Sequence, residues 1–165
     1  THRAVVLGFD ALDWRYLARY ADALPNFQRL RERGVAAPLE STMPPWTGSA
    51  WPSMYTGTDP SHHGVFGFFR HDDYPDEGDV VSRADVDAPA LWNYCSSEGL
   101  PSVVCNVPVT HPAEPIDGAL VPGYLAGEDA PGHPDDVRDR LSDAIGEPYR
   151  IYSRGELARD RKSVV

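Results

Sequence analysis

Continuous apolar runs mark three strand candidates along the chain. Residues 3–9 contain such a run, which is typical of a strand buried on both faces of a parallel sheet, and the run ends at Asp10. Residues 35–39 form a second candidate, which Pro38 would confine to a sheet edge or a strand end. Residues 102–107 form the third. We expect functional side chains at the carboxyl ends of such strands.

Helical spacing of apolar positions marks three further segments. Residues 24–33 have a proline in the first turn and Gly34 as a stop signal. Residues 89–98 form a second helix candidate closed by Gly99, and residues 135–145 form an acidic third one. Strands that alternate with helices predict an α/β protein, here a three-layer α/β/α fold with a largely parallel sheet.

The segment between these elements starts as a proline-stiffened loop. Within residues 41–57 a helix can begin only after Pro45, so Thr47 lies near a helix start. We expect the apolar residues of 65–69 to pack the following tight loop onto the core. Residues 70–87 are rich in charged side chains and predict an exposed loop.

Length and charge narrow the class of protein. A chain of 165 residues fits one domain, and its formal net charge of -10 disfavours nucleic acid as a partner. No run approaches the roughly 20 apolar residues that cross a bilayer, and the first residues lack a signal-peptide pattern, so we expect a cytoplasmic protein without membrane contact. Cys95 and Cys105 lack metal-binding or disulfide-framework spacing, and we expect both to be buried free thiols.

Two residues could carry chemistry. Asp10, at the end of a strand, could present its carboxylate to a divalent cation, or it could cap the short segment that follows. Thr47, at a helix start, would place a hydroxyl beside backbone N–H groups that can bind a phosphoryl oxygen, or it could merely cap the helix. A metal on this hydroxyl would lower its pKa and make it a nucleophile.

Four stretches carry a resemblance to a known family: Gly8–Asp10, Leu24–Leu30, Ser41–Thr47 and Tyr55–Val65. In this order and spacing they resemble the start of the type I phosphodiesterase and nucleotide pyrophosphatase branch of the alkaline phosphatase superfamily, especially its phosphohydrolase/phosphomutase-like members. Weaker similarity continues through residues 104–112 and 118–127.

The resemblance implies roles for the two candidates. Asp10 matches the strand-end aspartate that ligates a metal, and Thr47 matches the nucleophile, which also touches metal. Two divalent metal ions, Zn or Mn, are implied with them. Thr42 fails the spacing, and Ala50 replaces the asparagine that helps nucleotide pyrophosphatases to bind phosphate, which favours the phosphohydrolase/phosphomutase-like group.

The histidines are weaker candidates. His62 and His63 invite a metal assignment, but the resemblance places the pair His63 and Gly64 in a structural loop after the nucleophile helix, and we expect a structural role. Asp129 and His133 have the spacing of a ligand pair. They lie in a loop rich in proline and glycine, and we interpret this pair as a coincidence.

The function implied is hydrolysis of a small phosphorylated substrate through a covalent threonine intermediate. The alternatives are a phosphomutase-like transferase and a truncated, non-catalytic domain that binds a phosphorylated ligand. Two metals need more donors than Asp10 and Thr47 supply. We therefore expect residues 1–165 to be the N-terminal portion of a single catalytic domain, with further ligands downstream; the oligomeric state stays open.

Overall fold

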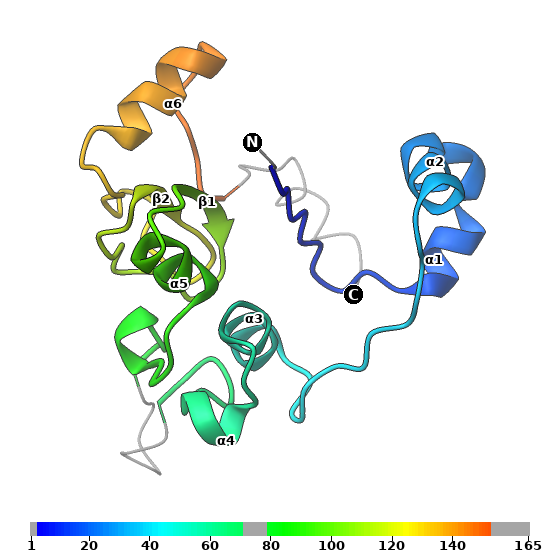
Figure 1. The fold of residues 1–165 in the computed structure, drawn as a ribbon, viewed down its shortest axis with the longest axis horizontal. Helices are drawn as coiled ribbons and strands as arrows, with labels where there is room; N and C mark the ends of the chain where they lie inside the picture. Colours follow the sequence, from blue (N-terminus) through cyan, green and yellow to red (C-terminus); the bar gives the residue numbers. More distant parts are fainter. Residues whose placement is uncertain (1–2, 71–78, 153–165) are drawn as a thin grey trace, which may run out of the picture. The chain divides into compact units, whose positions relative to one another are not determined.

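The computed structural model describes residues 3–70 and 79–152 (Figure 1). It divides into two compact units, Thr1–Ser41 and Thr42–Val165. Each unit has its own local structure and is described by itself.

The first unit is helical in its described part. Its elements are α1 (Trp14–Arg19), the 3-10 helix η1 (Ala21–Ala23) and α2 (Pro25–Arg33). The Asp13 carboxylate caps α1 by accepting a hydrogen bond from the Arg15 backbone N–H at 2.7 Å. The predicted helix over residues 24–33 is confirmed, because Pro25 occupies its first position and the chain leaves the helix at Gly34.

The two strand predictions in this unit are wrong. Residues 3–9 are without strand pairing, and the Val5 and Val6 side chains are 82% and 73% exposed. Residues 35–39 likewise form no strand, with Val35 98% exposed. A strand requires a hydrogen-bonded neighbour, and the described part of this unit offers none. The Phe9 ring instead packs on Phe27 of α2, with ring centroids 5.3 Å apart.

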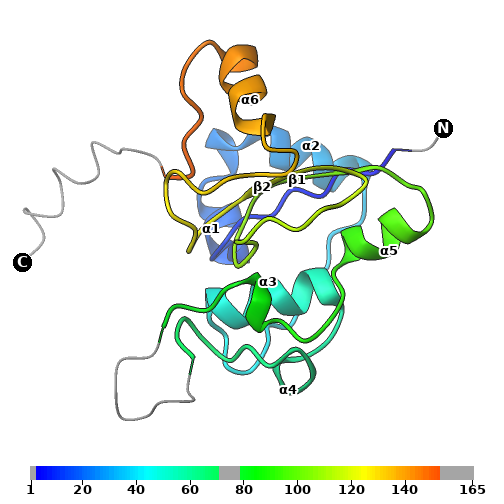
Figure 2. The same cartoon turned by 90° about the vertical axis from the view of Figure 1, so that its left-hand side faces the viewer.

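The second unit combines helices with a parallel sheet, which confirms the α/β class (Figure 2). Its described elements are α3 (Thr47–Thr56), α4 (Pro60–His63), η2 (Arg83–Asp85), α5 (Leu91–Ser97), β1 (Ser102–Val107), β2 (Gly118–Pro122) and α6 (Val137–Ile145). The two strands form a two-stranded parallel sheet. Helix α5 contacts β1, α6 contacts β2, and α3 contacts α4.

Local sequence explains most of these elements. The prediction of β1 is confirmed over residues 102–107, and α5 and α6 lie inside the predicted ranges 89–98 and 135–145. Strand β2 was not predicted. Its first residue, Gly118, pairs with Ser102 so closely that a Cβ on Gly118 would lie 1.9 Å from the Ser102 carbonyl oxygen.

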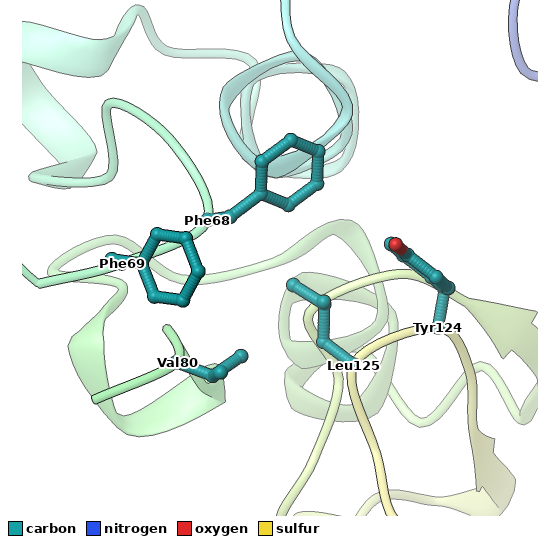
Figure 3. Close-up of a pocket in the computed structure, with 5 residues that line it drawn as sticks. All are labelled: Phe68, Phe69, Val80, Tyr124 and Leu125. Atoms are coloured by element: carbon teal, nitrogen blue, oxygen red, sulfur yellow. The ribbon is translucent and has the colours of Figure 1, made fainter. Parts of the chain in front are cut away.

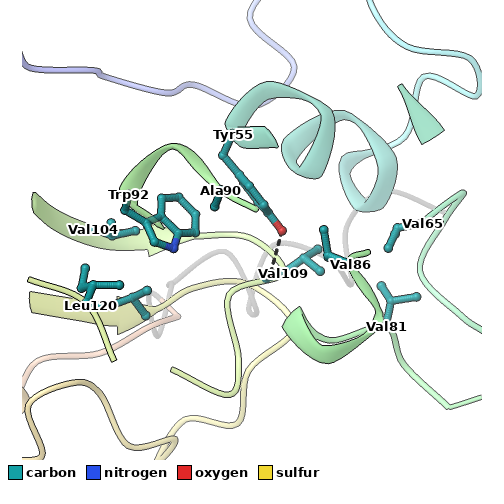
Figure 4. Close-up of a cluster of buried hydrophobic side chains, with 10 residues drawn as sticks. Tyr55, Val65, Val81, Val86, Ala90, Trp92, Val104, Val109 and Leu120 are labelled. Carbon is teal, nitrogen blue, oxygen red and sulfur yellow. Dashed lines mark hydrogen bonds between the residues drawn. The ribbon is translucent and has the colours of Figure 1, made fainter. Parts of the chain in front are cut away.

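The core of the second unit joins α3 and α5 to the sheet (Figure 4). The Tyr55 ring packs on Trp92, with centroids 4.8 Å apart, over the buried side chains of Val104 and Leu120. The Tyr55 hydroxyl donates a hydrogen bond to the Val109 carbonyl at 2.9 Å. Helix α3 is therefore tied to the loop that follows β1.

A largely buried ion pair contacts this core at Trp92. The Nε of Arg83 donates to Glu114 Oε1 at 3.0 Å, and the side chains are 12% and 24% exposed. The Trp92 indole N–H donates to the same carboxylate oxygen. Removing one member would leave the other charge buried without its partner, so this pair is costly to break.

Side chains alternate across β1, which decides the environment of Cys105, whereas Cys95 lies on α5. Val104 faces the core, whereas Cys105 is exposed and Cys95 is half-buried. Both thiols are free, as predicted, but the predicted burial is wrong for Cys105, because neighbouring residues of a strand point to opposite faces.

None of the helices in the described ranges has the length and apolar character needed to span a bilayer.

Candidate active site

Thr47 is the first residue of α3, as the prolines before it predict. Trp46 holds the N-cap position in an extended conformation, so Thr47 itself is not the capping residue. The first amides of a helix have no carbonyl partner within the helix, and they carry the positive end of the helix dipole. The Thr47 hydroxyl thus lies where an anion would be favoured.

The turn before α3 is braced by two short side chains. The buried Ser49 hydroxyl donates to the Pro44 carbonyl at 2.7 Å and also lies 3.1 Å from the Trp46 carbonyl. The Thr42 hydroxyl donates to the same Pro44 carbonyl at 3.0 Å. Thr42 therefore supports the turn from outside the helix.

Gly48 brings the first turn of α3 against a neighbouring loop. A Cβ on Gly48 would lie 2.2 Å from the Gly67 carbonyl oxygen and 3.2 Å from the Phe68 backbone nitrogen. A Cβ on Gly67 would in turn lie 3.1 Å from the Trp46 ring. Gly48 is therefore needed for the backbone of residues 67–68 to lie against the start of the helix, and Gly67 leaves room for the Trp46 ring.

Aromatic rings continue from this contact. Trp46 stacks on Phe68 at a centroid distance of 6.3 Å and an interplanar angle of 16°. Phe68 meets Tyr124 edge to face at 6.3 Å, and Tyr124 meets Tyr152 in the same way at 6.0 Å. Tyr124 follows the carboxyl end of β2, so this row links the end of the sheet to the residue before Thr47.

A pocket opens beside this row (Figure 3). It has a volume of about 250 Å³, and we call it the aromatic pocket. Its lining residues come from three segments: Phe68, Phe69, Val80, Tyr124 and Leu125. Sequence reasoning did not find it. We predicted that residues 65–69 pack onto the core, and Val65 does so, but Phe69 is 53% exposed.

Hydrogen bonds fix two walls of the aromatic pocket. Phe69 and Val80 form an antiparallel bridge, next to which the Val81 N–H donates to the Phe68 carbonyl at 3.0 Å. On the other side, Leu125 has a φ of 79°, and its N–H donates to the Tyr152 hydroxyl at 3.1 Å. A leucine in this left-handed conformation costs on the order of 1–3 kcal/mol, which the surrounding contacts must offset.

The two adjacent histidines have different environments. His63 is fully buried, with Nε2 2.8 Å from the Ser53 hydroxyl and Nδ1 accepting from the Val65 N–H at 3.2 Å. Burial lowers the pKa of His63 below its usual value. His62 is exposed, with its Nδ1 3.2 Å from Asp59. These contacts confirm the structural role predicted for His63.

Asp10 follows the extended segment of the first unit. It does not cap α1, because Asp13 holds that position. Asp10 belongs to the first unit and Thr47 to the second.

The donors for a metal are few in the described ranges 3–70 and 79–152. There, no group of three or more His, Cys, Asp and Glu side chains could hold an ion. The oxygens of Asp10 and Thr47 suit a divalent cation, but they number fewer than the four or more ligands that such an ion takes. The Nε2 of His133 lies 3.2 Å from the Ile116 carbonyl oxygen, which agrees with a coincidental spacing to Asp129.

The comparisons with known proteins found one family. The family model "Type I phosphodiesterase / nucleotide pyrophosphatase" matches residues 4–162. No curated protein matched the chain. No solved structure matched it either.

Proposed function

Because the chain belongs to the type I phosphodiesterase/nucleotide pyrophosphatase family, we propose that Thr47 is the nucleophile of a phosphoester hydrolase. The match spans nearly the whole chain, and the family is named for hydrolysis of phosphoester and pyrophosphate bonds. The substrate class is a small phosphorylated molecule, and the reaction passes through a covalent threonine intermediate.

The position of Thr47 at the start of the ten-residue helix α3 carries this proposal. Backbone N–H groups at a helix start bind phosphoryl oxygens, and the helix dipole favours the negative charge. Donors that a helix fixes in place before substrate binds can stabilise charge that develops during the reaction.

The proposed reaction has two steps. The Thr47 oxygen forms a bond to phosphorus while the bond from phosphorus to the departing oxygen breaks, and the hydroxyl proton leaves with the departing alcohol through solvent. Water then attacks the phosphothreonine, which releases phosphate or a phosphomonoester and restores the hydroxyl.

Asp10 and Thr47 are the residues that would hold metal, as the resemblance implies. A bound Zn or Mn ion would lower the pKa of the hydroxyl. Within residues 3–70 and 79–152 no group of three or more His, Cys, Asp and Glu side chains could hold an ion, and the steps above are written for the start of α3 alone.

Trapping the intermediate tests the proposal. The native protein is incubated with Zn or Mn and bis(4-nitrophenyl) phosphate, quenched in acid and digested with trypsin. Thr47 and Thr42 then lie on one peptide, residues 34–70, and fragmentation tells them apart. We expect a phosphoryl-type mass increase on Thr47, which Thr47→Val abolishes.

Thr42→Val is the matched control, because Thr42 supports the turn and fails the nucleophile spacing. It should keep the label on Thr47. A label on another residue, or hydrolysis that survives Thr47→Val, would show that Thr47 is not the nucleophile. Transfer of the phosphoryl group within the substrate, without its release, would identify a mutase.

A further inference from the structure

We propose that one exposed face of helix α2 binds a phosphate group through the guanidinium groups of Arg29 and Arg33. This site belongs to the first unit, so it is independent of the function proposed for Thr47, which lies in the second unit. The ligand is free inorganic phosphate or a small phosphomonoester, which share the same doubly charged group.

A hollow on the surface of α2 marks the place. It has a volume of about 380 Å³ and is lined by Asn26, Arg29, Leu30 and Arg33, all of them exposed. Residues three and four positions apart lie on the same face of a helix, so these side chains are neighbours. The volume lies within the usual range of roughly 300–1,000 Å³ for small-molecule sites, which leaves room for a phosphate group with a small organic part.

The donors of this hollow match the oxygens of phosphate. Each guanidinium carries its N–H groups in a planar fork that suits phosphate oxygens. The Nη2 of Arg29 donates to the Asn26 Oδ1, which orients this guanidinium and leaves the Asn26 NH₂ group as an additional donor. A phosphate group can accept from both arginine forks at once, whereas a single carboxylate offers two oxygens and one charge.

The charges of these two arginines are not neutralised by carboxylates of the chain. Among the described residues, neither Arg29 nor Arg33 forms an ion pair, whereas Arg15 pairs with Asp13 and Arg83 pairs with a glutamate. Two like charges four positions apart destabilise a helix. A doubly charged anion bound between them replaces this repulsion with attraction, so it stabilises α2.

The distribution of charge along the sequence agrees with an anion site in the first unit. Residues 1–41 hold six of the 15 Lys and Arg residues but only five of the 25 Asp and Glu residues. Exposed charges separated by more than about 8 Å are largely screened at physiological ionic strength. A ligand on α2 therefore responds to the nearby arginines more than to the net charge of -10.

Titration of the native protein with inorganic phosphate, without added metal and at low salt, tests the inference. Binding is followed by ¹H–¹⁵N NMR, and we expect the amide signals of α2 to shift with a dissociation constant on the order of 1 mM. Arg29→Gln and Arg33→Gln should each weaken this binding about tenfold, because each removes hydrogen bonds from a charged donor. Glutamine is a good helix former, so both variants keep α2, which far-UV circular dichroism checks.

Arg31→Gln is the matched control. It removes the same charge from the same helix, but the Arg31 guanidinium lies over the Trp14 ring, 5.8 Å from its centroid, and does not line the hollow. Phosphate binding should therefore be nearly unchanged in this variant. Equal losses in all three variants would assign the binding to overall charge and overturn the inference.

Two further titrations identify the ligand. Glycerol 3-phosphate distinguishes the two sources of the phosphate group: tighter binding of this ester would assign the hollow to a phosphomonoester, and tighter binding of inorganic phosphate would assign it to the free ion. Tighter binding of succinate, a dicarboxylate, than of either would overturn the inference. So would the absence of α2 shifts at tens of millimolar phosphate, or shifts confined to α3, which would instead support an anion site beside Thr47.

Discussion

Gly48 and Gly67 lie backbone to backbone: a Cβ on Gly48 would be 2.2 Å from the Gly67 carbonyl oxygen. This contact places the residue after the proposed nucleophile against the loop that carries Phe68. No side chain at position 48 is compatible with it unless the loop moves.

Gly48→Ala is therefore expected to be strongly destabilising. The added methyl group meets backbone rather than a flexible side chain, so we expect a loss of about 1–3 kcal/mol or more in the free energy of unfolding, measured in urea. Gly127→Ala is the control, because nothing lies within 4 Å of a Cβ there. A Gly48→Ala protein as stable as Gly127→Ala would show that the loop of residues 67–68 moves without a loss in the free energy of unfolding.

His63 makes stability depend on pH. Burial lowers the pKa of His63, so in the unfolded chain it takes up a proton near pH 6.5, whereas in the folded protein it does so only at lower pH. Between these values the unfolded state binds more protons, and stability falls as the pH is lowered through this window.

The urea midpoint should therefore drop between pH 7.5 and pH 5.5. In His63→Gln this drop should be smaller, even though the variant is less stable at pH 7.5 through the loss of its contact with Ser53. His62→Gln, which changes the exposed neighbour, is the control. An unchanged drop in His63→Gln would assign the pH dependence to other groups.

The backbone of Leu125 supplies a third prediction. At a φ of 79° a Cβ is unfavourable, so Leu125→Gly should be more stable than Leu125→Ala by about 1 kcal/mol, the reverse of the usual order. Thermal unfolding of the two variants measures this difference. Both lose the leucine side chain, so the comparison isolates the backbone. If Leu125→Ala were the more stable, the left-handed conformation would be absent in solution.

Sequence reasoning succeeded where one residue type sets a boundary. Pro25 and Gly34 fix the ends of α2, and the prolines before Thr47 fix the start of α3. The position of Thr47 at the start of a helix could therefore be predicted from the sequence, and its role as nucleophile stays a proposal.

Sequence reasoning failed where an element forms only in contact with a segment far away in the sequence. The apolar run of residues 3–9 indicates burial but does not supply a strand to pair with, while the short β2 forms because β1 lies beside it. The aromatic pocket could not be predicted from the sequence either. Its five residues belong to three segments, and only the fold brings Phe69, Val80 and Leu125 together.

The Tyr152 hydroxyl accepts from the Leu125 N–H and donates to the Ala126 carbonyl at 2.9 Å, while its ring packs on Tyr124. A chain cut after residue 151 would keep the residues of each helix and strand described above. It would lose both hydrogen bonds of the Tyr152 hydroxyl and the ring contact with Tyr124, which support the pocket wall at Leu125. The contacts that hold this wall thus extend beyond α6, and a boundary drawn at the end of that helix would exclude them.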